Sequence, residues 1–164
     1  MQLKFRSFAV LFGISLLGAC SLPLDTTEHA ALAVCETTRV KDGDSVLARC
    51  DGEDLEIRLV CIDAPELSQK PYGAWAKRAL TGLLGESFQA DYQGKDRYGR
   101  TLATLWRDQR DLNLELLSTG DAVLYRKYCS KSKYLAAEAA ARNGKIGVWD
   151  GEYSFIMPWE WRRR

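Results

Sequence analysis

The sequence is poor in histidine and shows no excess of basic residues. Its one histidine, His29, lies near the amino end, which argues against a mechanism with histidine as base, acid or nucleophile. The formal net charge is only +1, so a broad electrostatic footprint for nucleic acid is excluded. The five cysteines include no C-x-x-C pair and no histidine cluster, which disfavours a zinc site. Any attraction for a polyanion must therefore be local.

The longest apolar run extends from Phe8 to Ala19 and is too short to span a bilayer comfortably. Lys4 and Arg6 precede it, and this order of a basic and then an apolar region is typical of a signal peptide. Residues 1–19 are therefore predicted to be a signal that exports the protein. Without Lys4 and Arg6, the 23 basic residues become 21 against 22 acidic ones, a net charge of about −1.

The apolar run ends in Leu17-Gly18-Ala19-Cys20, which resembles the lipobox of bacterial lipoprotein signals. Cleavage before Cys20 predicts an envelope lipoprotein whose only attachment to the membrane is a lipid anchor on Cys20. The alternative is ordinary cleavage at the A-x-A sequence 31–33, which predicts a periplasmic or secreted protein.

The remaining chain divides into a tether, one domain and a tail. At 164 residues with 46% hydrophobic content, it has room for one domain with a real core. Residues 20–33 are small and polar and read as a tether, residues 34–150 carry regular periodicity, and residues 151–164 form a C-terminal tail. No obligate protein partner is indicated, so a monomer is expected.

Hydrophobic periodicity and turn residues predict an α+β domain. Three strands, one helix, two strands and then two helices are expected in that order, which is the pattern of a five-stranded OB-fold β-barrel with about three helices. The expected strands are 34–41, 45–50, 55–61, 87–93 and 101–106, and the expected helices are 71–84, 111–118 and 134–142.

Five charged residues on short, turn-rich motifs suggest chemistry at a phosphodiester. Asp44 follows a turn at Asp42-Gly43, Asp63 and Glu66 lie in Asp63-Ala64-Pro65-Glu66, and Arg58 and Arg100 complete the set. Carboxylates can hold a hard cation and direct a water, and calcium tolerates an irregular, loop-built site better than magnesium. Arginines can bind a pentavalent phosphorus through paired donors.

Each motif alone has an ordinary explanation. Asp42-Gly43 is a common hairpin turn, and an arginine in a strand is more often a surface ion-pair partner than a catalyst. The loop 96–100 alone would be a charged hairpin, and the arginine run 162–164 is usually a solvated tail that could touch nucleic acid or anionic headgroups. The joint occurrence of the motifs, in order, favours a nuclease-type site.

The ordered motifs resemble the staphylococcal nuclease (thermonuclease) family from about Val34 to Trp149. The shared segments are DGDS, IRL, IDAPE, PYG, DRYGR, Asn113, Tyr125, Tyr128, AE at 137–138 and GVW at 147–149. The resemblance implies an OB-fold, calcium-dependent enzyme that hydrolyses DNA and RNA to leave 3′-phosphates. Ser45 and Ala64 stand where the family's best-known member has threonine; Ser45 keeps the hydroxyl, and a carbonyl ligand does not need the side chain.

By motif, the resemblance implies a role for each residue of the site. Asp44, Asp63 and the Ala64 carbonyl hold Ca²⁺, Glu66 positions or deprotonates the attacking water, and Arg58 and Arg100 bind the phosphate. Arg97, Tyr98, Tyr125 and Tyr128 are candidate substrate contacts, although Arg97 also suits a solvated loop and the two later tyrosines also suit simple packing. The alternative function is a non-catalytic, nucleic-acid-binding envelope lipoprotein of the same fold.

Four cysteines remain after Cys20, and three pairings are open to them. With Asp42-Gly43 as a two-residue turn, Cys35 lies opposite Cys50 at a hydrogen-bonded position of the hairpin, where Cα atoms are about 5.5 Å apart. This predicts the disulfides Cys35–Cys50 and Cys61–Cys129. Four buried free thiols are the alternative.

Overall fold

The computed structural model describes residues 32–164, which form one compact unit. The predicted signal peptide, the lipidation site Cys20 and nearly all of the predicted tether lie outside the described residues. Within residues 32–164, no helix combines the length and the apolar character needed to cross a membrane.

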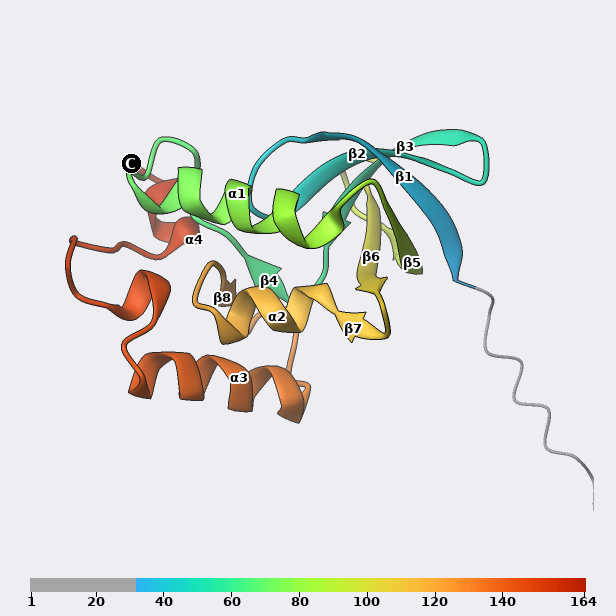
Figure 1. Ribbon diagram of the computed structural model, residues 1–164. Helices are drawn as coiled ribbons and strands as arrows, with labels where there is room; N and C mark the ends of the chain where they lie inside the picture. Colours follow the sequence, from blue (N-terminus) through green and yellow to red (C-terminus); the bar gives the residue numbers. More distant parts are fainter. Residues whose placement is uncertain (1–31) are drawn as a thin grey trace, which may run out of the picture. The chain divides into compact units, whose positions relative to one another are not determined.

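The elements follow the predicted order, with short additions (Figure 1). The long strands are β1 (Ala33–Val40), β2 (Ser45–Cys50), β3 (Glu53–Leu59), β5 (Ser87–Lys95) and β6 (Thr101–Arg107). The short strands are β4 (Ile62–Asp63), β7 (Arg110–Asp111) and β8 (Val123–Leu124). The helices are α1 (Tyr72–Leu84), α2 (Leu112–Ser118), α3 (Ser132–Asn143) and α4 (Pro158–Trp161), with a 3₁₀ turn at Gly147–Trp149.

The five long strands close into the predicted barrel. Their order is β3-β2-β1-β5-β6, and β6 pairs in parallel with β3 to complete the circle. Alternating side chains such as Val46, Ile57, Leu59 and Leu105 are buried inside. The α+β, OB-type fold is therefore confirmed, with β7 added beside β6 and a separate β4–β8 pair.

In the hairpin of β1 and β2, Cys35 faces Cys50 as predicted, but the loop and the strand pairing that produce this register differ from the prediction. The loop is longer than two residues, because Val40 pairs with Val46 rather than with Ser45. An irregularity between Thr37 and Arg39 then shifts the register back, so that Cys35 does face Cys50. The predicted hydrogen-bonded position is wrong: the Val34 carbonyl accepts from the Asp51 N–H (3.1 Å), which flanks a non-hydrogen-bonded pair.

Both predicted disulfides, Cys35–Cys50 and Cys61–Cys129, are present. The first crosses the narrow pair of the hairpin, with Cα atoms 4.0 Å apart. The second joins Cys61 to the segment before α3, across a sequence separation of 68. Cys61 does not end the third strand as predicted, because β3 ends at Leu59 and Cys61 lies in the turn before β4, with a φ of 68°. The second bridge therefore fixes the start of the Asp63–Glu66 loop to the helical part of the domain.

The helices begin and end close to the predicted residues. Pro71 is the N-cap of α1 and Gly85 its C-cap, and Asp111 caps α2 by accepting from the Leu114 N–H. The α3 helix begins two residues earlier than expected, at Ser132. Helix α2 contacts both α1 and α3, so the helices pack as a group beside the barrel (Figure 1).

Residues 151–164, here called the C-terminal segment, fold back onto the domain. Phe155, Met157 and Trp159 pack against a buried cluster of Tyr72, Val123 and Val148. Figure 1 shows α4 beside the N-terminal end of α1. The packing places the end of the chain next to the loop that carries Glu66.

Candidate active site

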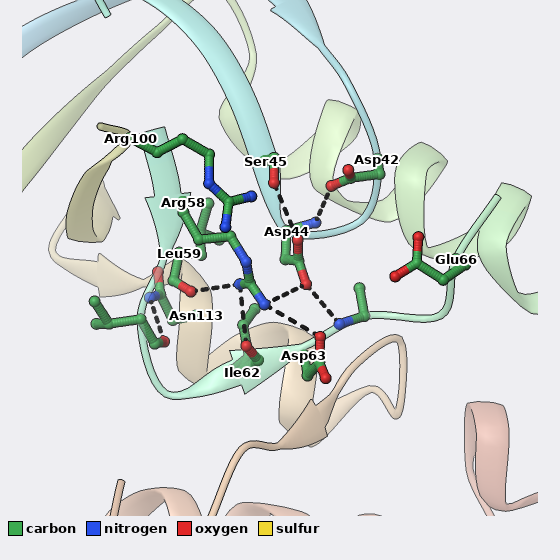
Figure 2. Close-up of polar contacts among 12 residues, drawn as sticks. Asp42, Asp44, Ser45, Arg58, Leu59, Ile62, Asp63, Glu66, Arg100 and Asn113 are labelled. Carbon is green, nitrogen blue, oxygen red and sulfur yellow. Dashed lines mark hydrogen bonds and ion pairs between the residues drawn. The ribbon is translucent and has the colours of Figure 1, made fainter. Parts of the chain in front are cut away.

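The centre of the site is Arg58, whose guanidinium joins the two carboxylates predicted to hold the metal (Figure 2). Its Nη2 atom lies 3.0 Å from Asp44 Oδ2 and 3.2 Å from Asp63 Oδ1. Its Nη1 atom donates to the carbonyls of Leu59 (2.7 Å) and Ile62 (3.0 Å). Since one nitrogen reaches both carboxylates, these groups converge on a single region.

Local backbone geometry brings these residues together. Arg58 pairs with Ser45 across β2 and β3, so it lies beside the end of the first hairpin. Cys61 has a φ of 68°, in the left-handed region, and this turn redirects the chain from β3 into β4, which carries Asp63. A short reversal therefore places Asp63 next to the preceding strand.

Gly43 lets the Asp44 loop approach the rest of the site. A Cβ at this position would lie 2.6 Å from the Cβ atoms of both Ala64 and Ala76. The glycine is thus required by close packing of the hairpin loop against α1 and the Asp63–Glu66 loop.

Asp44 is buried and accepts several hydrogen bonds. Its Oδ2 atom accepts from the Ala64 N–H (2.7 Å), and its Oδ1 atom accepts from the Ser45 hydroxyl (3.1 Å). Burial raises the pKa of Asp44 to about 7, and the nearby Arg58 guanidinium only partly opposes this effect. A positive charge in this region would favour the ionised carboxylate.

Glu66 lies at the edge of the site in a loop held against the first turn of α1. Its N–H donates to Gln69 Oε1 (2.9 Å), and its carbonyl accepts from the Gln69 N–H (2.8 Å). A Cβ on Gly73 would come within 2.0 Å of the Glu66 carbonyl oxygen, so only glycine permits this contact. The side chain of Glu66 is 35% exposed and can be reached from solvent.

Arg162 is a site residue that sequence reasoning missed. Its Nη1 and Nη2 atoms donate to the two oxygens of Asp63 at 3.0 and 2.7 Å, and Nη1 also donates to Glu66 Oε1 at 2.7 Å. These hydrogen bonds, the Asp63 pair first, raise the pKa of Arg162 above its usual value. Its position in a three-arginine run gave only the general expectation of a charged tail.

Arg100 precedes β6 and is held by its own loop. It forms an ion pair with Asp96, whose Oδ2 lies 2.7 Å from Arg100 Nη2 and accepts from Nε at 2.8 Å. Burial alone would raise the pKa of Asp96, but hydrogen bonds from Arg100 and Tyr98 lower it. Figure 2 shows the Arg100 side chain extended toward that of Arg58.

The candidate substrate contacts fall into two groups. Tyr98 is 70% exposed, with the Arg97 guanidinium carbon 4.8 Å and that of Arg100 5.7 Å from its ring centre. Tyr125 contacts the exposed Tyr128 edge-on (4.9 Å) and stacks on Trp159 of the C-terminal segment at 5.8 Å. The second aromatic group was predicted without Trp159, because long-range packing leaves no local signal.

The donor chemistry of the site fits a hard cation. Asp44 and Asp63 offer carboxylate oxygens, which calcium prefers. In the arrangement described, Arg58 and Arg162 take up those oxygens. No three carboxylate, histidine or cysteine side chains of residues 32–164 are placed closely enough together to hold a metal ion.

Comparison with known proteins places the chain in a family. The profile of the family described as staphylococcal nuclease homologue matches residues 56–151, which include Arg58, Asp63, Glu66 and Arg100. The chain belongs to this family. An uncharacterized endonuclease of Haemophilus influenzae is 33% identical over 163 residues, covering 98% of this chain and 86% of its own.

Two further relatives align with different shares of this chain. Protein ParB of Escherichia coli is 32% identical over 173 residues, covering 98% of this chain and 95% of its own. The thermonuclease of Staphylococcus intermedius is 32% identical over 125 residues, covering 68% of this chain and 73% of its own. Relatives that are named as nucleases support a nuclease activity acting on nucleic acid.

Proposed function

We propose that this member of the staphylococcal nuclease family is an exported, calcium-dependent enzyme that hydrolyses DNA and RNA and leaves 3′-phosphates. The observation that carries the proposal is the convergence of Asp44 and Asp63 on one nitrogen of Arg58. The carboxylate of Glu66 lies close to that of Asp63, since Arg162 Nη1 donates to both of them.

Asp44, Asp63 and the carbonyl of Ala64 are the groups proposed to hold calcium. When bound, the ion would supply positive charge to the phosphate and make a nearby water easier to deprotonate. The chain's own contribution is a pair of carboxylates fixed by Ser45, Arg58 and the Ala64 N–H.

Glu66 accepts a proton from the attacking water, a role that its half-exposed position at the edge of the site supports. The water oxygen forms a bond to phosphorus, and the bond from phosphorus to the 5′ oxygen breaks, so the phosphate stays on the 3′ side. The 5′ oxygen leaves with the electron pair of that bond, facing Arg100, and becomes a hydroxyl by taking a proton from solvent, to which Glu66 returns the proton of the attacking water. Arg58 and Arg100 donate hydrogen bonds to the extra negative charge of the transition state. Arg97, Tyr98, Tyr125 and Tyr128 are proposed to contact the nucleic acid.

A cleavage assay tests this function. The purified protein should cut plasmid DNA and RNA with calcium, should stop in chelator, and should leave ends that a 3′-phosphatase must treat before a polymerase extends them. Arg49, which forms an exposed ion pair with Asp54, offers a matched control for the Arg58→Ala variant. Full activity in chelator, or a preference for magnesium over calcium, would contradict the calcium site. Absence of cleavage under every condition would favour the non-catalytic binding module.

The location is also a proposal: a monomer anchored in the bacterial envelope through lipid on Cys20. The Cys20→Ser variant that is cleaved elsewhere should then move from the membrane fraction to the soluble fraction. A mature parent protein that is soluble and begins at Val34 would instead support ordinary signal cleavage.

A further inference from the structure

The strongest unexplained feature of the site is the contact made by Arg162 from the far end of the chain. Its guanidinium reaches residues 99 and 96 positions earlier, Asp63 and Glu66, through three hydrogen bonds of 2.7–3.0 Å. A guanidinium that binds a carboxylate through two parallel bonds is among the stronger ion pairs. The contact is therefore a defined interaction rather than the loose end of a solvated tail.

This contact closes the site to a cation. The Asp63 side chain is 0% exposed, and its two oxygens accept from Arg58 and Arg162. Glu66 Oε1, the proposed proton acceptor, also accepts from Arg162. A cation arriving from solvent can reach Asp63 on this side only after Arg162 has moved.

The C-terminal segment is anchored in a way that lets Arg162 move by itself. Pro158 is buried, and Gln69 Nε2 donates to the Ile156 carbonyl (2.8 Å), which fixes the chain before α4. Beyond that point, Trp161 Nε1 donates to the Ser68 hydroxyl (2.9 Å) in an exposed hydrogen bond. The Arg162 side chain is 41% exposed, so its release need not disturb the buried anchor.

We propose that Arg162 competes with the metal ion for Asp63. In the absence of the ion, Arg162 holds the site closed until calcium and substrate displace it. The proposal rests on the proposed function. Three carboxyl groups, those of Asp44, Asp63 and Glu66, share the two guanidinium groups of Arg58 and Arg162. A divalent cation would supply the positive charge that the three carboxyl groups together can accept. The cation and the Arg162 guanidinium compete for the same oxygens of Asp63, and each therefore weakens the binding of the other.

Calcium binding to the full mature protein, measured by calorimetry without substrate, tests the proposal directly. The Arg162→Gln variant should bind calcium about tenfold more tightly than the parent, a typical size for such coupling. Arg164→Gln removes the same charge from the same turn and should bind like the parent. Arg162→Lys keeps the charge but loses the paired donors, so its affinity should fall between those of the parent and Arg162→Gln.

Chymotrypsin cleavage after Trp161 supplies a second readout. Calcium should speed this cleavage in the parent, because binding of the ion breaks the contacts that hold the last turn, residues 161–164, against the Asp63–Glu66 loop. It should have little effect in Arg162→Gln, which lacks these contacts while the anchor before α4 remains. Equal calcium affinity in parent and Arg162→Gln, or weaker affinity in the variant, would overturn the competitor while leaving the calcium site standing. If no variant bound calcium, both the calcium dependence and the competitor would be wrong.

Discussion

Two buried carboxylates of this protein, Asp63 and Glu138, look alike but have different surroundings. The side chains are 0% and 1% exposed, and each is paired with two arginines. Glu138 lies alone in α3, where Oε1 accepts from the Leu124 N–H (2.9 Å) and Oε2 pairs with Arg126 (2.6 Å). Glu138 thus connects α3 to β8, and Arg126 and Arg142 compensate its negative charge.

Asp63 shares its arginines with other carboxylates. Arg58 also serves Asp44, and Arg162 also serves Glu66. Three acids around two bases leave a deficit of positive charge, whereas Glu138 with Arg126 and Arg142 has none. The comparison shows that the proposed cation site differs from the buried carboxylate of α3 in having carboxylates that share their donors, and not in burial.

The largest expected effect is on catalysis. Arg58→Ala and Glu66→Gln should each lower the cleavage rate about 100-fold or more, because both groups act on a charged transition state. Initial rates on plasmid DNA at saturating calcium measure this, and thermal unfolding checks that each variant is folded. Cleavage at the parent's rate by folded Glu66→Gln protein would remove Glu66 from its proposed role.

The next largest effect concerns the Cys61–Cys129 disulfide, which joins the turn before Asp63 to the segment before α3. Replacing Cys61 and Cys129 by serine should lower the free energy of unfolding by about 4 kcal/mol, since the bond closes a long loop. The activity of the remaining folded enzyme should also fall, because Cys61 begins the turn toward Asp63. Denaturant unfolding of the double variant measures the loss. Unchanged stability and activity would mean that the bridge does not brace the site.

Asp44, which shares Arg58 with Asp63, and Glu138 should respond with opposite signs to loss of charge. Asp44→Asn should unfold at a higher temperature than the parent in chelator near pH 8. Burial raises the pKa of Asp44 to about 7 from its ordinary 3.8, so between these pH values the folded protein keeps a proton that the unfolded chain has lost, and near pH 8 the folded protein holds a buried negative charge. Its favourable contribution is therefore present below about pH 4 and is lost as the pH rises toward about 7. A pH series of unfolding temperatures for both proteins shows this; a variant less stable at pH 8 would contradict it.

The smallest effect is expected at Glu138. Glu138→Gln should lower the free energy of unfolding by about 1 kcal/mol, because glutamine can still accept from the Leu124 N–H while the pairs with two half-exposed arginines are weakened. Urea unfolding measures the change, and activity per folded molecule should be unaffected. A gain in stability would show that the buried negative charge of Glu138, like that of Asp44, destabilises the folded protein.

Local patterns predicted most of the fold. The apolar stripe of α1, the cap at Asp111 and the alternation in β3 each depend on neighbours in sequence, and the structure has them where expected. The hairpin is instructive because the turn was predicted wrongly and the cysteine pair correctly. An irregularity between Thr37 and Arg39 compensated for the longer loop, and no sequence pattern indicates such a compensation.

The C-terminal segment marks the limit of sequence reasoning. Trp159 stacks on Tyr125, and Arg162 pairs with Asp63, across gaps of 34 and 99 residues that no periodicity connects. Gly43 was read as a turn residue, whereas the structure requires it for close contact with Ala64 and Ala76. Motif order predicted which residues gather at the site, and long-range packing decided what else joins them.

The most direct test of the calcium-dependent nuclease measures calcium binding and DNA cleavage on the same samples of parent, Asp63→Asn and Glu66→Gln protein. If Asp63 holds calcium and Glu66 accepts the proton, Asp63→Asn loses calcium affinity and activity together, whereas Glu66→Gln binds calcium and does not cleave. Cleavage at the parent's rate by Asp63→Asn protein that binds no calcium would contradict these roles.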